Sequence, residues 1–546
     1  MNMKRLTLII IFAAASIFGS RAAGEGSQLV HSPQVPILID RTDNILFEIR
    51  INGHRGEVLN SLTVEFGEPT DMADIEALRL FYGGTEGKAR KGMHFRPMNY
   101  IPNNQPGRTL AAHPSYSVLQ SEAEKPRESV VLTSGQPLVE GVNYFWVSVQ
   151  MSATTPTDAF VAAKVTGIEI DGKAVPVEQF GSTDARRVGI GVRHAGDDDV
   201  AAFRIPGLTT TRKGTLLGVY DVRRNNSADL QEAIDIGVSR STDKGRTWEP
   251  MRIAMTFDGE GGLPQAQNGV GDPSILTDEV TGTIWIVAAR TFGMGNLRAW
   301  TNSMPGMTAD DTAQLMMVRS DDDGETWSEP INITGQVKDP SWHFLLQGPG
   351  RGITMKDGTL VFPIQFIAPD RIPHAGIMYS KDRGATWHIN SPARSDTTEA
   401  QVAEIEDGVL MLNMRDNRGG SRAVAVTKDL GRTWTVHPSS RSALKEPICM
   451  ASLLSVKAKD NVLGRDLLLF SNPNTTRGRH HITVKASLDG GLTWPERNQV
   501  LLDEEEGWGY SCLTLVDSET IGILYESSVA HMTYQTIKIK DLVKQQ

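Results

Sequence analysis

Five aspartates occupy the same position in a repeated eight-residue pattern, Ser/Thr-x-Asp-x-Gly-x-Thr-Trp. The copies span residues 241–248, 320–327, 380–387, 427–434 and 487–494. Carboxylates in a regular pattern could transfer protons or bind a metal, but their neighbours favour a different role. The Asp side chain can accept hydrogen bonds from backbone amides inside a tight turn, and the Gly can supply the positive φ that such a turn needs. We therefore interpret these aspartates as turn residues and not as catalytic groups.

The side chains that usually bind transition metals are sparse or poorly spaced. The twelve His residues show no His-Glu-x-x-His or comparable spacing, and the chain of 546 residues has only two Cys. We predict no catalytic metal ligated by His or Cys, and no cofactor. Two Cys also exclude a disulfide scaffold, although Cys449 and Cys512 could either pair or remain buried and free.

The repeated pattern marks a series of β-hairpins. An apolar strand usually precedes each copy, as in residues 314–319, and the Thr and Trp begin the next strand. Hairpins repeated at this interval are typical of propellers, and residues 187–546 would give about six blades of about 60 residues each. The sequence therefore predicts a six-bladed β-propeller in which one blade lacks the marker.

The residues that precede the repeats have a different pattern of apolar and polar side chains. Residues 27–183 contain short alternating runs, including 45–51, 62–66, 138–151 and 165–170, and the last is followed by the hairpin-turn dipeptide Asp171-Gly172. This pattern predicts an antiparallel, sandwich-like β-domain, so the whole chain is expected to be all-β. The domain could bind carbohydrate or could support the propeller by packing against it.

The first 22 residues have the pattern of a secretory signal peptide. Lys4 and Arg5 precede an apolar run at 6–18, and Ser20-Arg21-Ala22 supplies small residues at the cleavage-determining positions. The run is too short to span a bilayer comfortably, and no other segment looks transmembrane. We therefore expect a secreted or periplasmic protein after cleavage.

The overall composition narrows the function classes. Hydrophobic residues at 39% and charged residues at 22% fit a soluble globular protein. The formal net charge of −10 argues against a general nucleic-acid binder, which needs a basic surface.

The segment Phe203-Arg204-Ile205-Pro206, together with the five repeats, resembles the sialidase (neuraminidase) superfamily, in which the repeat is called the Asp-box. The resemblance covers most of residues 190–530. It implies a six-bladed propeller with the active site at the mouth of the central channel. It also implies substrates that end in sialic acid, a sugar with a carboxylate on its anomeric carbon.

The resemblance implies that three arginines bind this carboxylate, and Arg204, Arg415 and Arg479 match them. Arg477 is a close alternative for the third position. A cluster of guanidinium groups suits the task because each offers planar, permanently charged donors.

The resemblance also implies a tyrosine nucleophile, which matches Tyr510, and a carboxylate base, which matches Glu399. A neutral phenol avoids the like-charge repulsion that a carboxylate nucleophile would meet at a carbon bearing a carboxylate. Tyr525 is the weaker alternative for the nucleophile.

The family's general acid matches Asp229, with Asp221 and Asp235 as alternatives. Arg223 and Asp272 match positions that contact the substrate.

Two further residues complete the predicted site. Glu526 matches the acid that holds the first arginine in place, and Gln347 could reach the rim of the pocket. An orienting acid is expected on physical grounds because clustered arginines repel one another.

Together these features predict a retaining exo-α-sialidase that hydrolyses terminal sialic acid from glycoproteins, glycolipids or oligosaccharides through a covalent tyrosyl intermediate. A trans-sialidase or an intramolecular trans-sialidase is the alternative within the fold, and a non-catalytic Asp-box lectin is the alternative outside it. The expected partners are sialylated glycans, with no nucleic acid, no membrane span and no obligate protein partner.

Overall fold

The computed structural model describes residues 28–85, 87–88, 96–97, 117–182, 184–294 and 298–544. The predicted signal peptide, residues 1–22, lies outside these ranges. Within them the α-helices are short: α1 (Ala299–Asn302), α2 (Thr334–Val337) and α3 (Ile539–Leu542). None of the described helices has the length and apolar character needed to cross a bilayer. Strands make up most of the regular structure, so the predicted all-β class is confirmed.

The N-terminal part is a β-sandwich, as predicted. One sheet has the order β13-β1-β3-β10-β5-β8, and the other contains β14-β11-β4-β9. The strands of the first sheet are β1 (Gln28–Ser32), β3 (Asn44–Gly53), β5 (Ile75–Gly84), β8 (Val118–Glu124), β10 (Gly141–Met151) and β13 (Val177–Gly181). Those of the second are β4 (Val58–Gly67), β9 (Ser129–Pro137), β11 (Phe160–Ile170) and β14 (Arg186–Arg193). Short strands at the margins are β2 (Ile37–Leu38), β6 (Gly87–Lys88), β7 (Arg96–Pro97) and β12 (Lys173–Val175).

One apolar core lies between the two sheets and includes Phe47, Leu80 and Phe145, all fully buried. The alternating runs read from the sequence supply this core because successive side chains of a strand point to opposite faces. Asp171 and Gly172 have φ of 50° and 70° in the turn between β11 and β12, which confirms the predicted hairpin.

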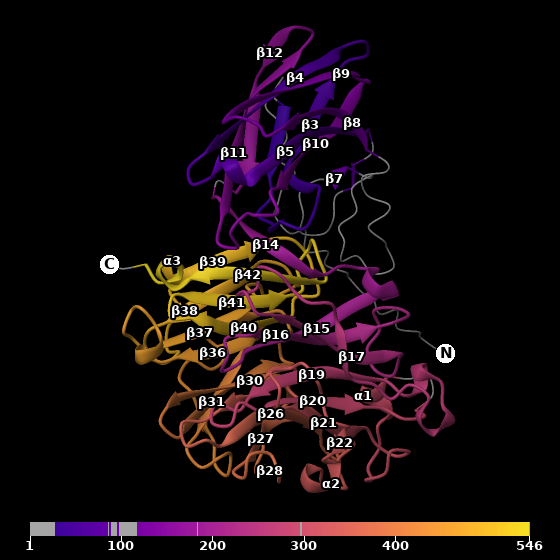
Figure 1. Ribbon diagram of the computed structural model, residues 1–546, viewed down its shortest axis with the longest axis vertical. Helices are drawn as coiled ribbons and strands as arrows, with labels where there is room; N and C mark the ends of the chain where they lie inside the picture. Colours follow the sequence, from indigo (N-terminus) through magenta and orange to yellow (C-terminus); the bar gives the residue numbers. More distant parts are fainter. Residues whose placement is uncertain are drawn as a thin grey trace, which may run out of the picture.

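The second part is a ring of six sheets, each containing a row of four paired strands, and some sheets carry additional strands (Figure 1). The first blade is β15 (Ala202–Thr210), β16 (Leu216–Arg223), β17 (Ile234–Ser241) and β18 (Arg252–Met255). The second is β19 (Val270–Thr277), β20 (Ile284–Arg290), β21 (Gln314–Ser320) and β22 (Ile331–Asn332), with β24 (Gly350–Arg351) at its edge. The third is β23 (Phe344–Gln347), β26 (Leu360–Ile367), β27 (Pro373–Ser380) and β28 (His388–Ile389), with β25 (Ile353–Thr354) and β29 (Arg394–Ser395) attached.

The remaining three blades complete the ring. The fourth is β30 (Thr397–Glu406), β31 (Val409–Asp416), β33 (Ala423–Thr427) and β34 (Thr435–Val436). A separate two-stranded sheet joins β32 (Gly420–Ser421) to β35 (Lys445–Glu446). The fifth blade is β36 (Ser452–Val456), β37 (Leu467–Pro473), β38 (Ile482–Ser487) and β39 (Gln499–Asp503). The sixth is β40 (Ser511–Asp517), β41 (Thr520–Tyr525) and β42 (Met532–Lys538), and its fourth strand is β14.

The five Asp-boxes form the turns between the third and fourth strands of blades one to five. In the first copy the Asp243 carboxylate accepts a hydrogen bond of 2.9 Å from the backbone amide of Thr247, and Gly245 has φ of 89°. The prediction that these aspartates are turn residues is therefore confirmed. The sixth blade has no box because its fourth strand comes from the other end of the propeller and needs no hairpin.

Strand β14 belongs to both parts of the molecule. It pairs with β42 of the sixth blade, where Ile190 lies opposite Tyr534, and with β11 of the sandwich, where Arg187 lies opposite Phe160. The second sheet of the sandwich is therefore continuous with the sixth blade, as the position of β14 in Figure 1 shows. The predicted boundary near residue 183 stays a prediction.

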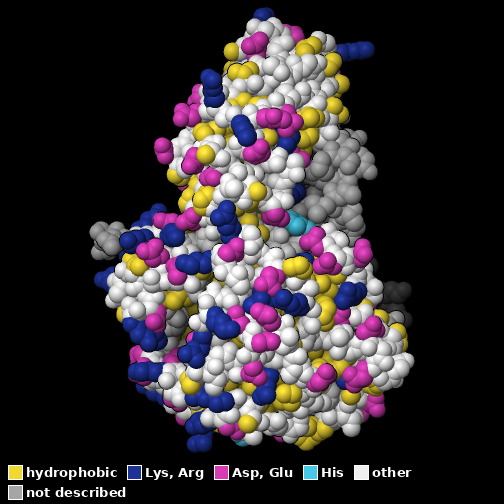
Figure 2. Space-filling model, viewed as in Figure 1, with side chains coloured by type: hydrophobic (Ala, Val, Ile, Leu, Met, Phe, Trp, Pro, Cys, Tyr) yellow, Lys and Arg dark blue, Asp and Glu magenta, His cyan; other side chains and the backbone are white. Residues whose placement is uncertain are grey.

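The surface seen in Figure 2 mixes acidic and basic side chains on both parts of the molecule. No large area of one sign is visible on this face, which fits a net charge that is modest for the length of the chain.

Candidate active site

A cavity of about 340 Å³ lies among the blades of the propeller and has the size of a small-molecule site. Seven of the residues predicted from the sequence line it: Arg204, Asp229, Asp272, Glu399, Arg415, Arg479 and Tyr510. They come from five of the six blades or from the loops that join them, so the ring brings together residues that are far apart in the chain.

β-Bulges aim three of these side chains. The register of the strand pairing shifts at Arg204 in β15, at Asp272 in β19 and at Glu399 in β30. An extra residue in a strand bends it locally and redirects a side chain, and bulges are common beside active sites for that reason. Pro206 and Pro273 lie in the first two bulges, where a strand can tolerate a residue without an N–H.

The two bulges that contain proline share a strained backbone position. Ile205 has φ of 63° and Asp272 has φ of 59°, although neither residue is glycine. In each case a buried carboxylate binds the amide of the strained residue. Glu526 accepts from Ile205 N at 2.9 Å, and Asp221 accepts from Asp272 N at 2.8 Å. These hydrogen bonds offset the backbone strain and fix the cavity wall.

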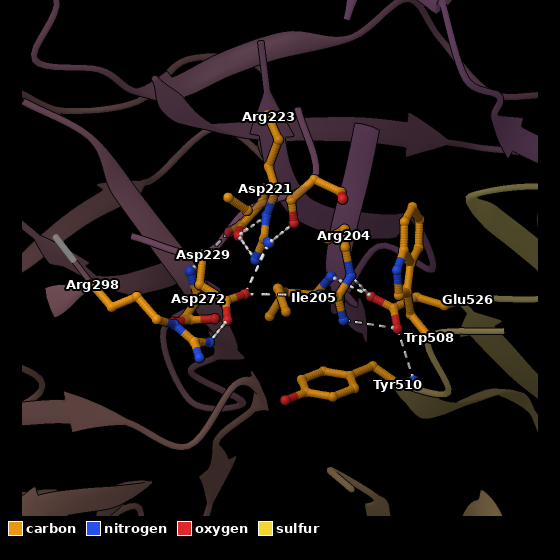
Figure 3. A network of polar contacts seen from close by, with 12 residues as sticks. Arg204, Ile205, Asp221, Arg223, Asp229, Asp272, Arg298, Trp508, Tyr510 and Glu526 are labelled. Carbon is orange, nitrogen blue, oxygen red and sulfur yellow. Dashed lines mark hydrogen bonds and ion pairs between the residues drawn. The ribbon is translucent and has the colours of Figure 1, made fainter. Parts of the chain in front are cut away.

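Glu526 organises one wall of the cavity (Figure 3). Its fully buried carboxylate accepts from Arg204 Nε at 2.9 Å and from Arg204 Nη2 at 3.3 Å. It also accepts from the backbone amide of Tyr510 at 2.9 Å. Burial by itself would lower the pKa of Arg204, but Glu526 outweighs it and raises that pKa above its ordinary value. One carboxylate thus positions both Arg204 and the backbone at Tyr510, which is the orienting role predicted for it.

Tyr510, Glu399 and Arg415 form a compact group at the cavity surface. The Tyr510 hydroxyl donates to Glu399 Oε1, and Arg415 Nη1 lies 2.5 Å from Glu399 Oε2 and 3.2 Å from the Tyr510 hydroxyl. Burial and the Glu399 carboxylate raise the pKa of the Tyr510 hydroxyl well above its ordinary value, against the opposite effects of Arg415 and Arg479. The phenol of Tyr510 therefore holds its proton more tightly than the hydroxyl of an exposed tyrosine does.

Three guanidinium groups surround the Tyr510 ring. Those of Arg204 and Arg479 lie 5.3 Å and 5.5 Å from its centroid, and Arg415 contacts its hydroxyl. Backbone carbonyls hold Arg479, which donates to Trp508 O at 3.0 Å. Arg477, the alternative for the third arginine, is exposed and does not line the cavity. The geometry favours Arg479.

Asp229 lies on the opposite wall, in the loop between β16 and β17. Arg223 Nη1 donates to its Oδ1 at 2.9 Å, Arg204 Nη1 lies 3.8 Å from the same oxygen, and Arg298 Nη2 contacts Oδ2 (Figure 3). The backbone brings Arg298 there, because Ala299 N donates to Leu230 O at 2.8 Å. Burial would raise the pKa of Asp229, but Arg223, Arg204 and Arg298 outweigh it and lower it to about 2.

Asp272 has the opposite electrostatic environment. Burial, together with the neighbouring carboxylates of Asp221 and Asp229, raises the pKa of Asp272 well above its ordinary value. Burial also raises the pKa of Asp221 to about 6, although Arg223 counteracts it. Two carboxyl groups with shifts of opposite sign, Asp229 and Asp272, therefore face the same cavity.

Besides Glu526, two predicted residues do not line the cavity. Arg223 is 1% exposed, and its Nε and Nη2 both donate to Asp221 Oδ2 at 3.1 Å and 2.9 Å. Residues two apart in a strand share a face, so Asp221 can bind the Arg223 guanidinium. Arg223 Nη1 also donates to Asp229 and therefore positions Asp229 without lining the cavity itself. Gln347 is fully buried and donates to the backbone carbonyl of Asp272. Both residues support the wall without reaching the cavity.

The remaining alternatives have other partners. Tyr525 is fully buried and donates to Gln535 at 2.8 Å, and Asp235 accepts from Arg224 at 2.7 Å. Neither residue, nor Asp221, lines the cavity. Cys449 and Cys512 are free and buried. Among the described residues, no group of three or more His, Cys, Asp or Glu side chains could hold a metal ion.

Sequence reasoning missed part of the lining. Arg298 is the charged residue in this group. The others are apolar or neutral polar side chains: Leu230, Ala299, Trp300, Phe344, Leu346, Gln365, Thr398 and Asn417. Thr398 Oγ1 and Arg415 Nε are buried, and neither has a hydrogen-bond partner among the described residues. Arg-x-Trp at 298–300 has no repeat or motif around it that could have drawn attention to it.

Two protein-family models match the chain. The N-terminal domain of BNR-repeat neuraminidase matches residues 26–174, and the BNR repeat-like domain matches residues 225–523. A sialidase of Bacteroides fragilis is 60% identical over 517 residues, which cover 94% of this chain and 95% of that protein. The solved Hadza microbial sialidase Hz136 is 64% identical with a TM-score of 0.90, covering 94% of this chain and 100% of that one. The leech intramolecular trans-sialidase shares the fold at a TM-score of 0.59 and 16% identity, over 92% of this chain and 98% of its own.

Proposed function

The chain belongs to the BNR-repeat sialidases, and on this premise we propose that it is a retaining exo-α-sialidase acting through a covalent tyrosyl intermediate. Its substrates in this proposal are glycoproteins, glycolipids or oligosaccharides that end in sialic acid. The observation that supports it most directly is the placement of the Tyr510–Glu399 pair between three arginines in one cavity.

The arginines provide the binding step. Arg204, Arg415 and Arg479 all approach the Tyr510 ring or hydroxyl, so a carboxylate bound among them would lie next to the phenolic oxygen. Sialic acid bears its carboxylate on the anomeric carbon. Binding that group therefore brings the anomeric carbon to Tyr510, and the correct placement of reacting atoms lowers the barrier substantially.

The first chemical step forms the covalent intermediate. Tyr510 Oη attacks the anomeric carbon while its proton passes to Glu399, with which it is already hydrogen-bonded. The glycosidic bond breaks, and Asp229 gives its proton to the leaving oxygen. Asp229 must first become protonated. A bound substrate carboxylate offsets the positive charge of the arginines, and this raises the pKa of Asp229 from about 2.

The second step releases the sugar with its original anomeric configuration. A water molecule attacks the anomeric carbon and gives a proton to the Asp229 carboxylate. The bond to Tyr510 breaks, and Glu399 returns the proton to the phenolate oxygen. Two displacements at one carbon give net retention.

The test compares two Tyr→Phe variants from the same blade. Tyr510→Phe removes the attacking oxygen and is expected to lower kcat for a fluorogenic sialoside by about 10³-fold or more. Tyr525→Phe removes a hydroxyl that binds Gln535 outside the cavity, and it should keep near-wild-type kcat. Incubation with a 2,3-difluorinated sialic acid followed by peptide mass spectrometry should find the adduct on Tyr510. Wild-type turnover by Tyr510→Phe, or an adduct on another residue, would contradict the proposal.

Product analysis separates hydrolysis from transfer. Proton NMR of the reaction with sialyllactose is expected to show release of the α-anomer of free sialic acid first. An anhydro sugar or a transferred sialoside would instead indicate that a group other than water resolves the intermediate.

A further inference from the structure

The segment that follows Glu526 is a tight turn, residues 527–530, between β41 and β42. The Ser527 hydroxyl accepts from Val529 N at 3.1 Å and from Ala530 N at 3.0 Å. Ser528 N donates to Asp503 Oδ2 at 2.6 Å. Ser527, Ser528, Val529 and Ala530 are all buried. The position of this turn sets the position of the Glu526 backbone, because the two are adjacent in the chain.

The N-terminal domain covers this turn. Val35 and Leu38 pack against Val529 and Ala530 in one buried apolar cluster. Arg41 Nη1 donates to Val529 O at 3.2 Å. The segment formed by residues 33–41 therefore contacts the turn through both side chains and a hydrogen bond.

This segment is itself fixed. Leu38 N donates to Asn44 Oδ1 at 2.8 Å, and Leu38 O accepts from Asn44 Nδ2 at 2.9 Å. Gln34 exchanges two hydrogen bonds of 2.8 Å with Glu504, next to the Asp503 that binds the turn. The buried Arg186 donates to Pro33 O at 3.2 Å. The turn is thus held between residues 33–41, which are themselves hydrogen-bonded to the rest of the molecule, and the end of β39.

The turn reaches Arg204 by a second route. His531, which directly follows the turn, accepts a hydrogen bond of 3.2 Å from the backbone amide of Phe203. Its ring also lies 4.9 Å from that of Trp508, over which the Arg204 guanidinium packs at 4.9 Å. A displaced turn would therefore disturb Arg204 through its backbone, its carboxylate partner and its aromatic neighbour.

We propose that the N-terminal domain is a positioning element of the active site, in which residues 33–41 hold the 527–530 turn and thereby place Glu526. Glu526 fixes Arg204, Ile205 and Tyr510 at once, so a small shift of this carboxylate moves both the anion site and the attacking tyrosine. A misplacement of about 1 Å can cost about 10²-fold in rate. The inference rests on the proposed function for its catalytic readout.

The test compares two Leu→Ala variants in the same domain. Leu38→Ala removes the contact with the turn, whereas Leu80→Ala opens a cavity in the sandwich core away from it, and both leucines are fully buried in the native protein. Both variants lose stability through a cavity. Assayed in the full chain well below the midpoint of unfolding, Leu38→Ala is expected to lower kcat/KM about tenfold, while Leu80→Ala stays within about twofold. Leu38→Met, which conserves volume, should restore most of the activity.

Two further measurements keep the inference testable. Calorimetric affinity for an unsaturated sialic acid analogue needs no covalent step, so it reports on Arg204 even if the tyrosyl mechanism is wrong. It should weaken in Leu38→Ala and not in Leu80→Ala. If Leu38→Ala does not fold, Arg41→Ala removes only the hydrogen bond to Val529 and is expected to lower kcat/KM about threefold. Equal losses of kcat/KM and of affinity in Leu38→Ala and Leu80→Ala would overturn the inference. If Leu38→Ala does not fold, an unchanged kcat/KM in Arg41→Ala would overturn it.

Discussion

The two walls of the cavity are built differently. On one wall, Arg204 and Tyr510 are 7% and 5% exposed, and Glu526 is fully buried with bonds to both. On the other wall the side chains of Asp229 and Arg298 are 42% and 70% exposed, and they meet across loops. One wall is a buried hydrogen-bonded network, and the other contains an ion pair that solvent can reach.

This difference fits two chemical tasks in the proposed mechanism. Recognition of an anion requires charges that do not reorganise when the ligand arrives, and a buried carboxylate that binds the guanidinium provides this. Asp229, the general acid in the proposed mechanism, must gain and lose a proton in each cycle, and this is easier if a charged partner can move away. Exposure of Arg298 permits such movement, whereas Arg223 behind the wall stays in place.

The largest effect is expected at the buried wall. Glu526→Gln keeps the shape but leaves Arg204 without its opposite charge in a buried position, which is costly to stability and to substrate binding. We expect kcat/KM to fall about 10³-fold and the unfolding midpoint to drop by several degrees. Steady-state kinetics and thermal unfolding measure the two effects. Unchanged stability would show that the buried wall is not held by this pair.

A smaller and more selective effect is expected at the exposed wall. Asp229→Asn removes the proton donor of the proposed mechanism, so kcat for sialyllactose should fall about 10²-fold or more. A 4-methylumbelliferyl sialoside, whose leaving group needs little protonation, should be affected less. The unfolding midpoint should also fall, because Arg223 and Arg204 lose an ion-pair partner, but by less than in Glu526→Gln because the Asp229 side chain is 42% exposed. Equal losses on both substrates would argue against the role of Asp229 as an acid.

The smallest effect is expected for Arg298→Gln. Arg298 is one of three arginines that lower the pKa of Asp229 to about 2, so its removal should raise that pKa. Protonated Asp229 then persists to higher pH, and the limb of the kcat/KM profile that reports it should move upward by about one pH unit. The ion pairs of Asp229 stabilise the folded state above about pH 4, and this stabilisation is lost as pH falls toward 2. Arg298→Gln removes one of these pairs, so the unfolding midpoint should be slightly lower at neutral pH and should fall slightly less between pH 4 and pH 2.

A matched control is available for this variant. Arg371 is exposed and donates to Thr301 O beside the same short helix, but it does not line the cavity. Arg371→Gln should therefore leave the pH profile unchanged. The same shift in both variants would assign the effect to general surface charge.

Much of this architecture could be predicted from local sequence. Each Asp-box contains its own turn, so the carboxylate, the glycine and the tryptophan act within eight residues, and five copies indicate the ring. Arg204 lies two residues before Pro206, and Asp272 lies directly before Pro273, so their bulges also have a local cause. Residues that lie in short recognisable motifs, such as the Asp-boxes and the segments around Arg204 and Asp272, could therefore be identified from the sequence.

Other features depend on contacts between distant segments. Arg298 meets Asp229 only because the start of α1 bonds to Leu230, and no pattern around it indicates this. The position of Arg223 behind the wall depends on its capture by Asp221. The pairing of β14 with β42 joins residues 190 and 534, and neither strand has a signal for the other.

The shared strand β14 also has a consequence for how the chain is made. Its partner β42 follows the strands of the other five blades in the chain, so the sixth blade cannot form until all of those blades have been synthesised. Until then β14 has an unpaired strand edge toward the propeller, and exposed edges promote aggregation. Closure of the ring is a contact between distant parts of the chain and is expected to be slow. Chaperone binding before this pairing would act on an open ring, while in the folded protein the strands that begin and end the propeller are joined in one sheet.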